Sequence, residues 1–268
     1  MSDLSGKQRI LMTVLTYPHP SEKHKELVCT AGITEDGRWI RLYPIDYRYR
    51  AKSQRFRKYQ WIEVEVEKVP AGKDKRPESY RPILDSIRLI GENIGTDHEW
   101  RERRQIIDSM PHKTLNQWKA DWEVDRTSLG IVRPTEVLDL EIRNATDASW
   151  KPKWQQFMSQ LTLFEPPPKP LRKIPYEFRY KFRCEGSDQI HTAMCEDWEL
   201  GVLFLRQADK HGSDEAAADD VKKKFFDDLC HASKDTRFFM GTRHPYNTWL
   251  VLGVFYPPKI KQPGLFDL

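Results

Sequence analysis

The stretch from Leu27 to Pro44, which decides the fold class, reads LVCTAGITEDGRWIRLYP. Its two arms, Leu27–Thr34 and Arg38–Pro44, are rich in the β-branched and aromatic residues that strands favour. The arms are joined through Glu35-Asp36-Gly37, and an Asp-Gly pair between apolar runs is a strong signal for a tight hairpin. The stretch therefore predicts two antiparallel strands connected by a short turn.

Further strands and helices are predicted on both sides of this hairpin. Apolar and polar residues alternate through Tyr59–Val69, which is typical of a half-buried strand. Other strands are predicted at Arg9–Tyr17, Glu136–Arg143, Tyr176–Cys184, Phe238–Met240 and Leu250–Tyr256. Helices are predicted at Asp97–Met110 with Asp97 as the cap, and at Thr114–Trp122, Trp150–Leu163, Asp197–Lys210 and Asp214–Ala232. Because strand and helix do not alternate regularly, we expect an α+β fold.

Prolines suggest where this fold is divided. Stacked prolines favour an extended segment without internal hydrogen bonds, and they occur together at Glu165-Pro166-Pro167-Pro168-Lys169-Pro170. We therefore expect a linker at 165–171. Before it, residues 1–164 would form a strand-rich, barrel-like domain with a helical insertion. After it, residues 172–258 would form a smaller α+β domain, followed by a flexible tail at 259–268.

Composition limits the class of protein. Hydrophobic residues make up 38% of the 268 residues and aromatic residues 12%, which is enough to build a core. No apolar run approaches the roughly 18–20 residues that span a bilayer, and the first residues do not resemble a secretory signal. Four cysteines are too few for a disulfide framework. We expect a soluble, cytoplasmic protein that binds no membrane.

The distribution of charge carries more information than the net charge of +4. Between Arg38 and Lys58, eight basic residues face one acid, Asp46, and aromatic residues are interleaved with them. Guanidinium groups pair with phosphate and rings stack on bases, so this pattern favours a nucleic-acid surface. The candidate residues are Arg38, Trp39, Arg41, Tyr43, Arg48, Arg50, Arg55 and Arg57. The alternative is a solvated hairpin whose charge is neutralised by Glu63, Glu65 and Glu67 on a neighbouring strand.

Two further features could carry chemistry. Arg243 and His244 lie in a polar segment between two apolar strands, where they could contact phosphate or bases, although this segment is also typical of an ordinary hairpin connection. Cys184, His191 and Cys195 form a weak candidate zinc site, in which His191 and Cys195 would share one face of a helical turn and Cys230, His231 or Asp188 would supply the fourth ligand. Buried free cysteines are the commoner outcome, so we expect no cofactor, with zinc as the exception.

The last seven residues contain Gln262, Leu265 and Phe266 in the pattern Gln-x-x-Leu-Phe. This pattern resembles the short peptide by which bacterial replication and repair proteins bind the sliding clamp. The resemblance implies that Leu265 and Phe266 would fill an apolar pocket and that Gln262 would form hydrogen bonds. Pro263 and Gly264 depart from the usual apolar and small residues. In the alternative, Leu265 and Phe266 pack on their own domain.

These features together favour a prokaryotic DNA- or RNA-binding protein of genome maintenance, mobile-element or anti-phage function. The first alternative is an enzyme that acts on nucleic acid, a nuclease or base-processing enzyme whose carboxylate or histidine site is not evident from motifs. Nucleotide-binding loops, hydrolase elbows and metalloprotease motifs are absent from the sequence. The second alternative is a protein-interaction adaptor that does not bind nucleic acid.

Overall fold

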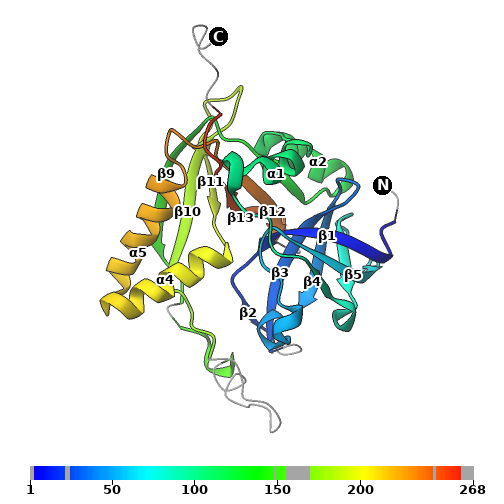
Figure 1. Cartoon of the computed structure of the whole chain (residues 1–268). Coiled ribbons are helices and arrows are strands. Elements are labelled where there is room, and N and C mark those ends of the chain that lie inside the picture. Colours follow the sequence, from blue (N-terminus) through cyan, green and yellow to red (C-terminus); the bar gives the residue numbers. More distant parts are fainter. Residues whose placement is uncertain (1–2, 22–24, 148, 155–169, 244–245, 261–268) are drawn as a thin grey trace.

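The computed structural model describes residues 3–21, 25–147, 149–154, 170–243 and 246–260. Two lobes lie side by side, an N-terminal lobe built almost entirely of strands and a C-terminal lobe of strands and helices (Figure 1). The expected α+β class is confirmed. In the described part of the chain, no helix is long and apolar enough to cross a membrane.

The N-terminal lobe is a closed barrel of five strands. Strands β1 (Gly6–Leu15), β3 (Lys25–Thr34), β4 (Trp39–Ile45), β6 (Ser79–Pro82) and β5 (Gln60–Lys68) are neighbours in that order. β1 also pairs with β5, which closes the barrel. Two short strands, β2 (His19–Ser21) and β7 (Arg88–Ile90), pair with β3 and β5. The predicted Asp36-Gly37 hairpin is confirmed, because β3 pairs antiparallel with β4 and Gly37 has a φ of 75°.

The order of these strands is that of the OB-fold, a five-stranded Greek-key barrel. Its first strand pairs with both the second and the fourth, and its third and fifth strands run parallel, as β4 and β6 do here. Alternate residues of each strand fill the barrel, among them Ile10, Val28, Ile40 and Ile62. The intervening residues point outward, so Arg41 lies outside the barrel between two residues that fill it.

The C-terminal lobe holds two three-stranded sheets. One contains β9 (Glu136–Asn144), β10 (Tyr176–Arg183) and β11 (His191–Met194), and the other contains β8 (Leu129–Val132), β12 (Arg237–Arg243) and β13 (Thr248–Phe255). A bridge between Cys195 and Val251 joins the two sheets. Because β9 pairs with β10 and β8 with β12, strand pairing crosses the linker that the prolines predict at 165–171.

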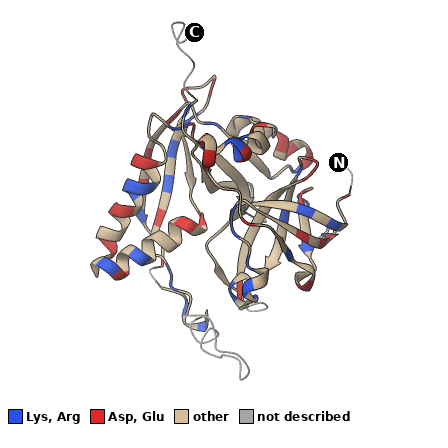
Figure 2. Ribbon diagram, viewed as in Figure 1, with Lys and Arg blue, Asp and Glu red and all other residues tan. Residues whose placement is uncertain are grey.

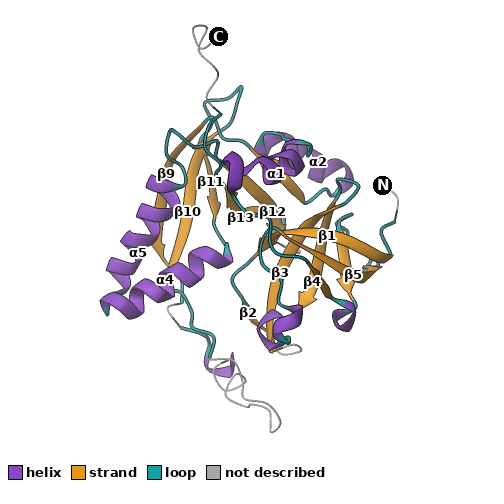
Figure 3. Ribbon diagram, viewed as in Figure 1, coloured by secondary structure: helices purple, strands orange, loops and turns teal. Residues whose placement is uncertain are grey.

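The helices lie mainly in or beside the C-terminal lobe (Figure 3). They are α1 (Asp97–Asp108), α2 (Leu115–Asp125), α4 (Trp198–His211) and α5 (Asp214–Lys222), and the last continues as a π-helix over Lys223–Asp228. Thr96, not Asp97, is the N-cap residue of α1, so the expected cap is wrong. Short 3-10 turns occur at Tyr47–Tyr49, Lys52–Gln54 and Leu84–Ser86. Most of the helix predicted at Trp150–Leu163 lies outside the described residues.

An apolar core joins the two lobes. Leu11, Ala31 and Ile33, on the outer face of the barrel, pack with Phe239 and Leu252 of the C-terminal lobe. Each of these side chains is almost completely buried. Removing such surface from water is favourable, so the lobes form one packed body and the junction between them is a fixed part of the fold.

Candidate nucleic-acid interface

A cavity of about 540 Å³ lies at the junction of the two lobes. One wall is the outer face of β3 and β4, another is the segment around β6, and the third comes from β12 and β13. The charged and polar residues that line it are Thr16, His19, Ser21, Cys29, Arg41, Tyr43, Lys73, Asp74, Arg76, Ser79, Tyr80, Arg81, Glu196, Thr242 and Arg243. The five basic side chains among them, two of which are buried, outnumber the two acids.

Arg41 forms part of this cavity and is 1% exposed. Its guanidinium donates from Nη1 to the sulfur of Cys29 at 3.1 Å, and from Nη2 to the hydroxyl and carbonyl oxygens of Ser128 at 3.2 and 3.3 Å. The remaining nitrogen, Nε, is buried and has no hydrogen-bond partner in the described residues. A buried guanidinium with an unused donor is costly, so it is a natural partner for an anion that enters the cavity.

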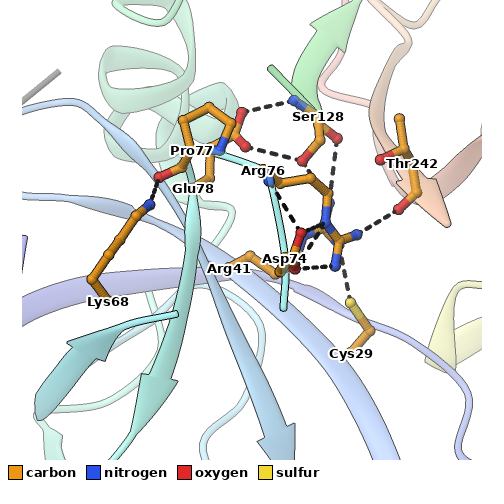
Figure 4. Close-up of polar contacts among 9 residues, drawn as sticks. All are labelled: Cys29, Arg41, Lys68, Asp74, Arg76, Pro77, Glu78, Ser128 and Thr242. Atoms are coloured by element: carbon orange, nitrogen blue, oxygen red, sulfur yellow. Dashed lines mark hydrogen bonds and ion pairs between the residues drawn. The ribbon is translucent and has the colours of Figure 1, made fainter. Parts of the chain in front are cut away.

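Ser128 connects Arg41 to a buried carboxylate (Figure 4). The Ser128 hydroxyl donates to Glu78 Oε2 at 3.0 Å while it accepts from Arg41. The backbone N–H of Ser128 donates to Glu78 Oε1 at 2.8 Å. Glu78 therefore offsets the charge of Arg41 through one hydroxyl group, and the segment that precedes β6 is held against the start of β8.

Arg76 makes a second connection between the lobes. Its guanidinium forms an ion pair with Asp74 at 2.7 Å and donates to the carbonyl oxygen of Thr242 at 3.1 Å. Burial would raise the pKa of the Asp74 carboxyl, but the hydrogen bonds and charge of Arg76 outweigh it and lower that pKa to about 2. The segment between β5 and β6 is thus fixed in place, and Arg76 is engaged within the protein.

Three exposed basic residues line the same cavity. Lys73 and Arg81 come from the barrel, and Arg243 comes from the end of β12. In the described part of the chain, none of the three has a carboxylate within ion-pair distance. Glu196 lines the same cavity and has a buried carboxylate oxygen, Oε1, without a hydrogen-bond partner in the described residues. The exposed cations can therefore meet a polyanion without first losing an internal partner.

Much of the basic run from Arg38 to Lys58 is neutralised by carboxylates, most of which lie outside the run. Arg38 pairs with Asp36 at 2.6 Å, Arg48 with the buried Glu26 at 3.1 Å, and Arg50 with Asp46 and Asp85 at 2.9 and 3.0 Å. Lys58 pairs with Asp197 at 2.7 Å. Figure 2 accordingly shows basic and acidic segments interleaved over both lobes. Apart from Asp46, which belongs to the run itself, these acids come from other segments, and not from Glu63, Glu65 and Glu67.

The remaining predicted residues differ in their surroundings. Arg55 donates to the carbonyl oxygens of Arg50 and Arg48 at 2.6 and 2.8 Å and stays exposed, as does Arg57. Trp39 packs edge-to-face on Phe239, with ring centroids 5.9 Å apart. Tyr43 is 43% exposed and lines the cavity together with Arg41 and Arg243. His244 lies outside the described residues.

The expected zinc geometry is wrong in one respect. His191 begins strand β11 and Cys195 follows its end, so the two are not on a helical turn. Four residues along a strand span roughly 13 Å, which is too far for one ion. No group of three or more His, Cys, Asp and Glu side chains among the described residues is arranged to hold a metal. The expectation of no cofactor, with zinc as the exception, stays a prediction that metal analysis of the purified protein tests.

Several residues of the site carry no signal in the sequence. Arg76, Glu78, Ser128 and Thr242 come together only when the lobes pack, and they lie in segments without periodicity. Gln262, Leu265 and Phe266 lie outside the described residues. Lys259, shortly before them, donates its backbone N–H to the carbonyl oxygen of Ser233 at 2.7 Å, which fixes the point where the described chain approaches its end.

Comparisons with known proteins give the following matches. Residues 110–268 match the family model described as domain of unknown function (DUF8757), and residues 6–109 match one described as domain of unknown function (DUF8758). The boundary at 109 and 110 falls between the barrel and the C-terminal lobe. No curated protein matches the chain.

Two solved structures cover nearly the whole chain at low similarity. The crystal structure of the tetrameric p202 HIN2 is 8% identical, with a TM-score of 0.31, and the match covers 96% of this chain and 93% of that chain. The structure of a murine DNA-binding protein bound with double-stranded DNA is 7% identical, with a TM-score of 0.32 and coverage of 96% and 98%. Similarities this low carry no argument about function.

Proposed function

We propose that this protein, which belongs to the family described as domain of unknown function (DUF8757), binds nucleic acid at the cavity between its lobes. The observation that carries this proposal is the set of five basic side chains in one cavity on the outer face of β3 and β4. Lys73, Arg81 and Arg243 would bind backbone phosphates. Arg41, at the bottom of the cavity, would donate a hydrogen bond from its unused Nε.

The fold supports the same surface by analogy. OB-folds bind oligonucleotides on the face of their second and third strands and with the loops that follow their first and fourth strands. In this chain those strands are β3 and β4, and those loops contain β2 and residues 69–78. His19 and Ser21 from the first loop and Lys73 and Arg76 from the second line the cavity. A fold alone does not establish function, so the argument rests on these side chains.

The cavity is a better candidate than the basic run from Arg38 to Lys58. Arg48 and Arg50 are held by carboxylates, and a phosphate would have to displace these partners. Exposed arginines and lysines without partners instead lose only counterions and water when they meet a phosphate. Of the predicted run, Arg41 and Tyr43 belong to the cavity, and Arg57 remains an exposed cation that could extend the interface.

The salt dependence of binding tests the proposal. A labelled single-stranded oligonucleotide would be titrated against the wild type and against the triple variant Lys73→Ala, Arg81→Ala, Arg243→Ala. Each lost phosphate contact lowers the slope of log affinity against log salt by about 0.7, so we expect the triple variant to lose about 2 units of slope. Equal slopes for the two proteins would show that the cavity is not part of the nucleic-acid interface.

A control variant tests the effect of removing exposed charge away from the cavity. Arg101 on α1 and Lys223, the first residue of the π-helix, are exposed and do not line the cavity between the lobes. The double variant Arg101→Ala, Lys223→Ala should keep the wild-type slope. Turnover of the labelled oligonucleotide with added divalent metal would instead favour the nuclease alternative.

We further propose that the last residues bind a bacterial sliding clamp, which would place the protein in prokaryotic genome maintenance. The support is the sequence Gln262-Pro263-Gly264-Leu265-Phe266 and the position of the chain just before it. Ile260 is 64% exposed, and Lys259 is bonded to the body of the protein. A segment that begins at this point can reach a groove on a partner while the lobes keep their own contacts.

A further inference from the structure

A second, smaller cavity of about 280 Å³ lies beside the cavity between the lobes. His19, Glu196 and Arg243 line both of them, so the two spaces meet at these three side chains. The second cavity is lined mainly by the C-terminal lobe, with Tyr17 and His19 contributed by the segment that follows β1. A ligand in the first cavity can therefore extend into the second by passing Arg243.

The second cavity differs from the first in its chemistry. Aromatic rings line it, those of Tyr17, Trp150 and Tyr176, together with the apolar side chains of Ile174 and Leu200. Flat rings of this kind bind nucleobases by stacking, and stacking tolerates any base because every base has a π-face. The first cavity is suited to phosphate and the second to a base.

Hydrogen bonds hold two of these rings in position. The indole N–H of Trp150 donates to the carbonyl oxygen of Leu171 at 2.9 Å. The hydroxyl of Tyr17 donates to the carbonyl oxygen of Arg172 at 2.7 Å. The Tyr17 ring also lies directly against Gly201, where an added Cβ would come within 2.3 Å of it. Rings fixed in advance lose little conformational entropy when a ligand binds.

Glu196 supplies a polar partner where the two cavities meet. Its carboxylate oxygen Oε1 is buried and lies 4.0 Å from His19 Nε2, beyond hydrogen-bond distance, and no described residue donates to it. A carboxylate accepts hydrogen bonds from the amino groups of bases. Arg243, on the same boundary, is exposed and positioned to meet the phosphate of the same nucleotide.

We propose that the second cavity receives one unstacked nucleobase of a strand whose phosphates occupy the first cavity, so that the ligand is single-stranded nucleic acid. This inference rests on the proposed function and specifies its substrate class. In a duplex each base is paired and stacked, and it cannot enter a cavity of about 280 Å³ without being pulled out of the helix. Binding at both cavities therefore selects strands with unpaired bases.

The test compares three ligands of one sequence by fluorescence anisotropy with the full-length protein. They are a labelled single strand, the duplex formed from it, and a single strand of abasic nucleotides. We expect the duplex and the abasic strand to bind at least about 10-fold more weakly than the single strand. That margin lies within the roughly 5- to 150-fold range expected for the loss of one base-stacking contact.

Two variants locate the effect in the second cavity. Trp150→Ala removes a ring, and Ala145→Phe fills the space with a new one, since Ala145 lines the same cavity. Each should weaken binding of the normal single strand roughly 5- to 150-fold and leave the abasic strand and the salt slope unchanged. Melting temperatures identify a variant that fails to fold, and the two variants alter the cavity in opposite ways.

The outcomes separate this inference from the proposed function. If the duplex binds as tightly as the single strand, or if both folded variants bind the single strand as the wild type does, the inference is overturned while binding at the first cavity stands. If the wild-type protein binds none of the three ligands, the proposed function itself fails.

Discussion

Arg41 and Ser128 lie 87 positions apart in the sequence, yet the guanidinium of Arg41 donates to both the hydroxyl and the carbonyl oxygen of Ser128. This contact joins the barrel to the C-terminal lobe at the base of the cavity. It also places a buried cation where a solvent-exposed arginine would be expected from the strand alone. The candidate site is therefore a property of the junction, and changes at the junction should affect stability and binding together.

The Ser128 hydroxyl should contribute to stability because it serves two charged groups. Ser128→Ala leaves Arg41 and Glu78 each without one hydrogen bond in a buried setting, and we expect a loss of about 1–3 kcal/mol in the free energy of unfolding. Urea denaturation measures this loss. Ser53→Ala, at an exposed position, should stay within about 0.5 kcal/mol of the wild type. Equal stability of the two variants would show that the hydroxyl link is dispensable.

The ion pair of Lys58 and Asp197 makes another connection between the lobes. Burial would lower the pKa of Lys58, but the carboxylates of Asp197 and Glu199 outweigh it and raise that pKa, so Lys58 is charged at neutral pH. Lys58→Met leaves Asp197 buried without its cation, and we expect a loss of about 3–5 kcal/mol. Lys7→Met, which breaks an exposed pair with Glu63, should cost less than about 1 kcal/mol. A similar small cost for both variants, measured by urea denaturation, would contradict this account.

The protein should become less stable as the pH decreases, because the Asp74 carboxylate is protonated. Its pKa of about 2 in the folded protein lies below its ordinary value of 3.8, so the unfolded chain binds the proton more readily. The contribution of the Asp74–Arg76 pair is therefore fully present above about pH 4 and is lost as the pH falls towards 2. Melting temperatures of the wild type and of Asp74→Asn, measured between pH 5 and pH 2.5, should differ most at pH 5 and converge at the acid end. A constant difference across this range would mean that Asp74 does not titrate as described.

Deleting residues 262–268 tests the sliding-clamp proposal. We expect the melting temperature to stay nearly unchanged, since terminal residues seldom stabilise a core, while binding to a purified bacterial clamp is lost. Leu265→Ala with Phe266→Ala should abolish clamp binding without the deletion, because a few side chains carry most of a short peptide's affinity. A clear drop in melting temperature, or a peptide of residues 259–268 that fails to bind at high micromolar concentration, would favour packing of Leu265 and Phe266 on their own domain.

The sequence predicted the elements better than the site. Asp36-Gly37 marks the hairpin, and the alternation through Tyr59–Val69 marks a barrel strand, because both signals are local. The alternation of apolar and polar residues also predicts that Arg41 lies on the outer face of β4. It does not show that Ser128, 87 positions away, covers that face. For the same reason, the acids that neutralise Arg48 and Arg50 could not be found from the basic run itself. The prolines at 166–168 suggested a division that strand pairing crosses.

The reactivity of Cys29 reports directly on whether nucleic acid occupies the cavity between the lobes. This half-buried thiol lines the cavity and accepts a hydrogen bond from Arg41, whereas burial raises the pKa of Cys184 and Cys195 and raises that of Cys230 to about 12. Cys29 should therefore be alkylated first by iodoacetamide, as followed by mass spectrometry. With a saturating single-stranded oligonucleotide, we expect alkylation of Cys29 to slow several-fold while that of Cys230 is unchanged. An unchanged rate at Cys29, with the oligonucleotide bound by anisotropy, would contradict binding in this cavity.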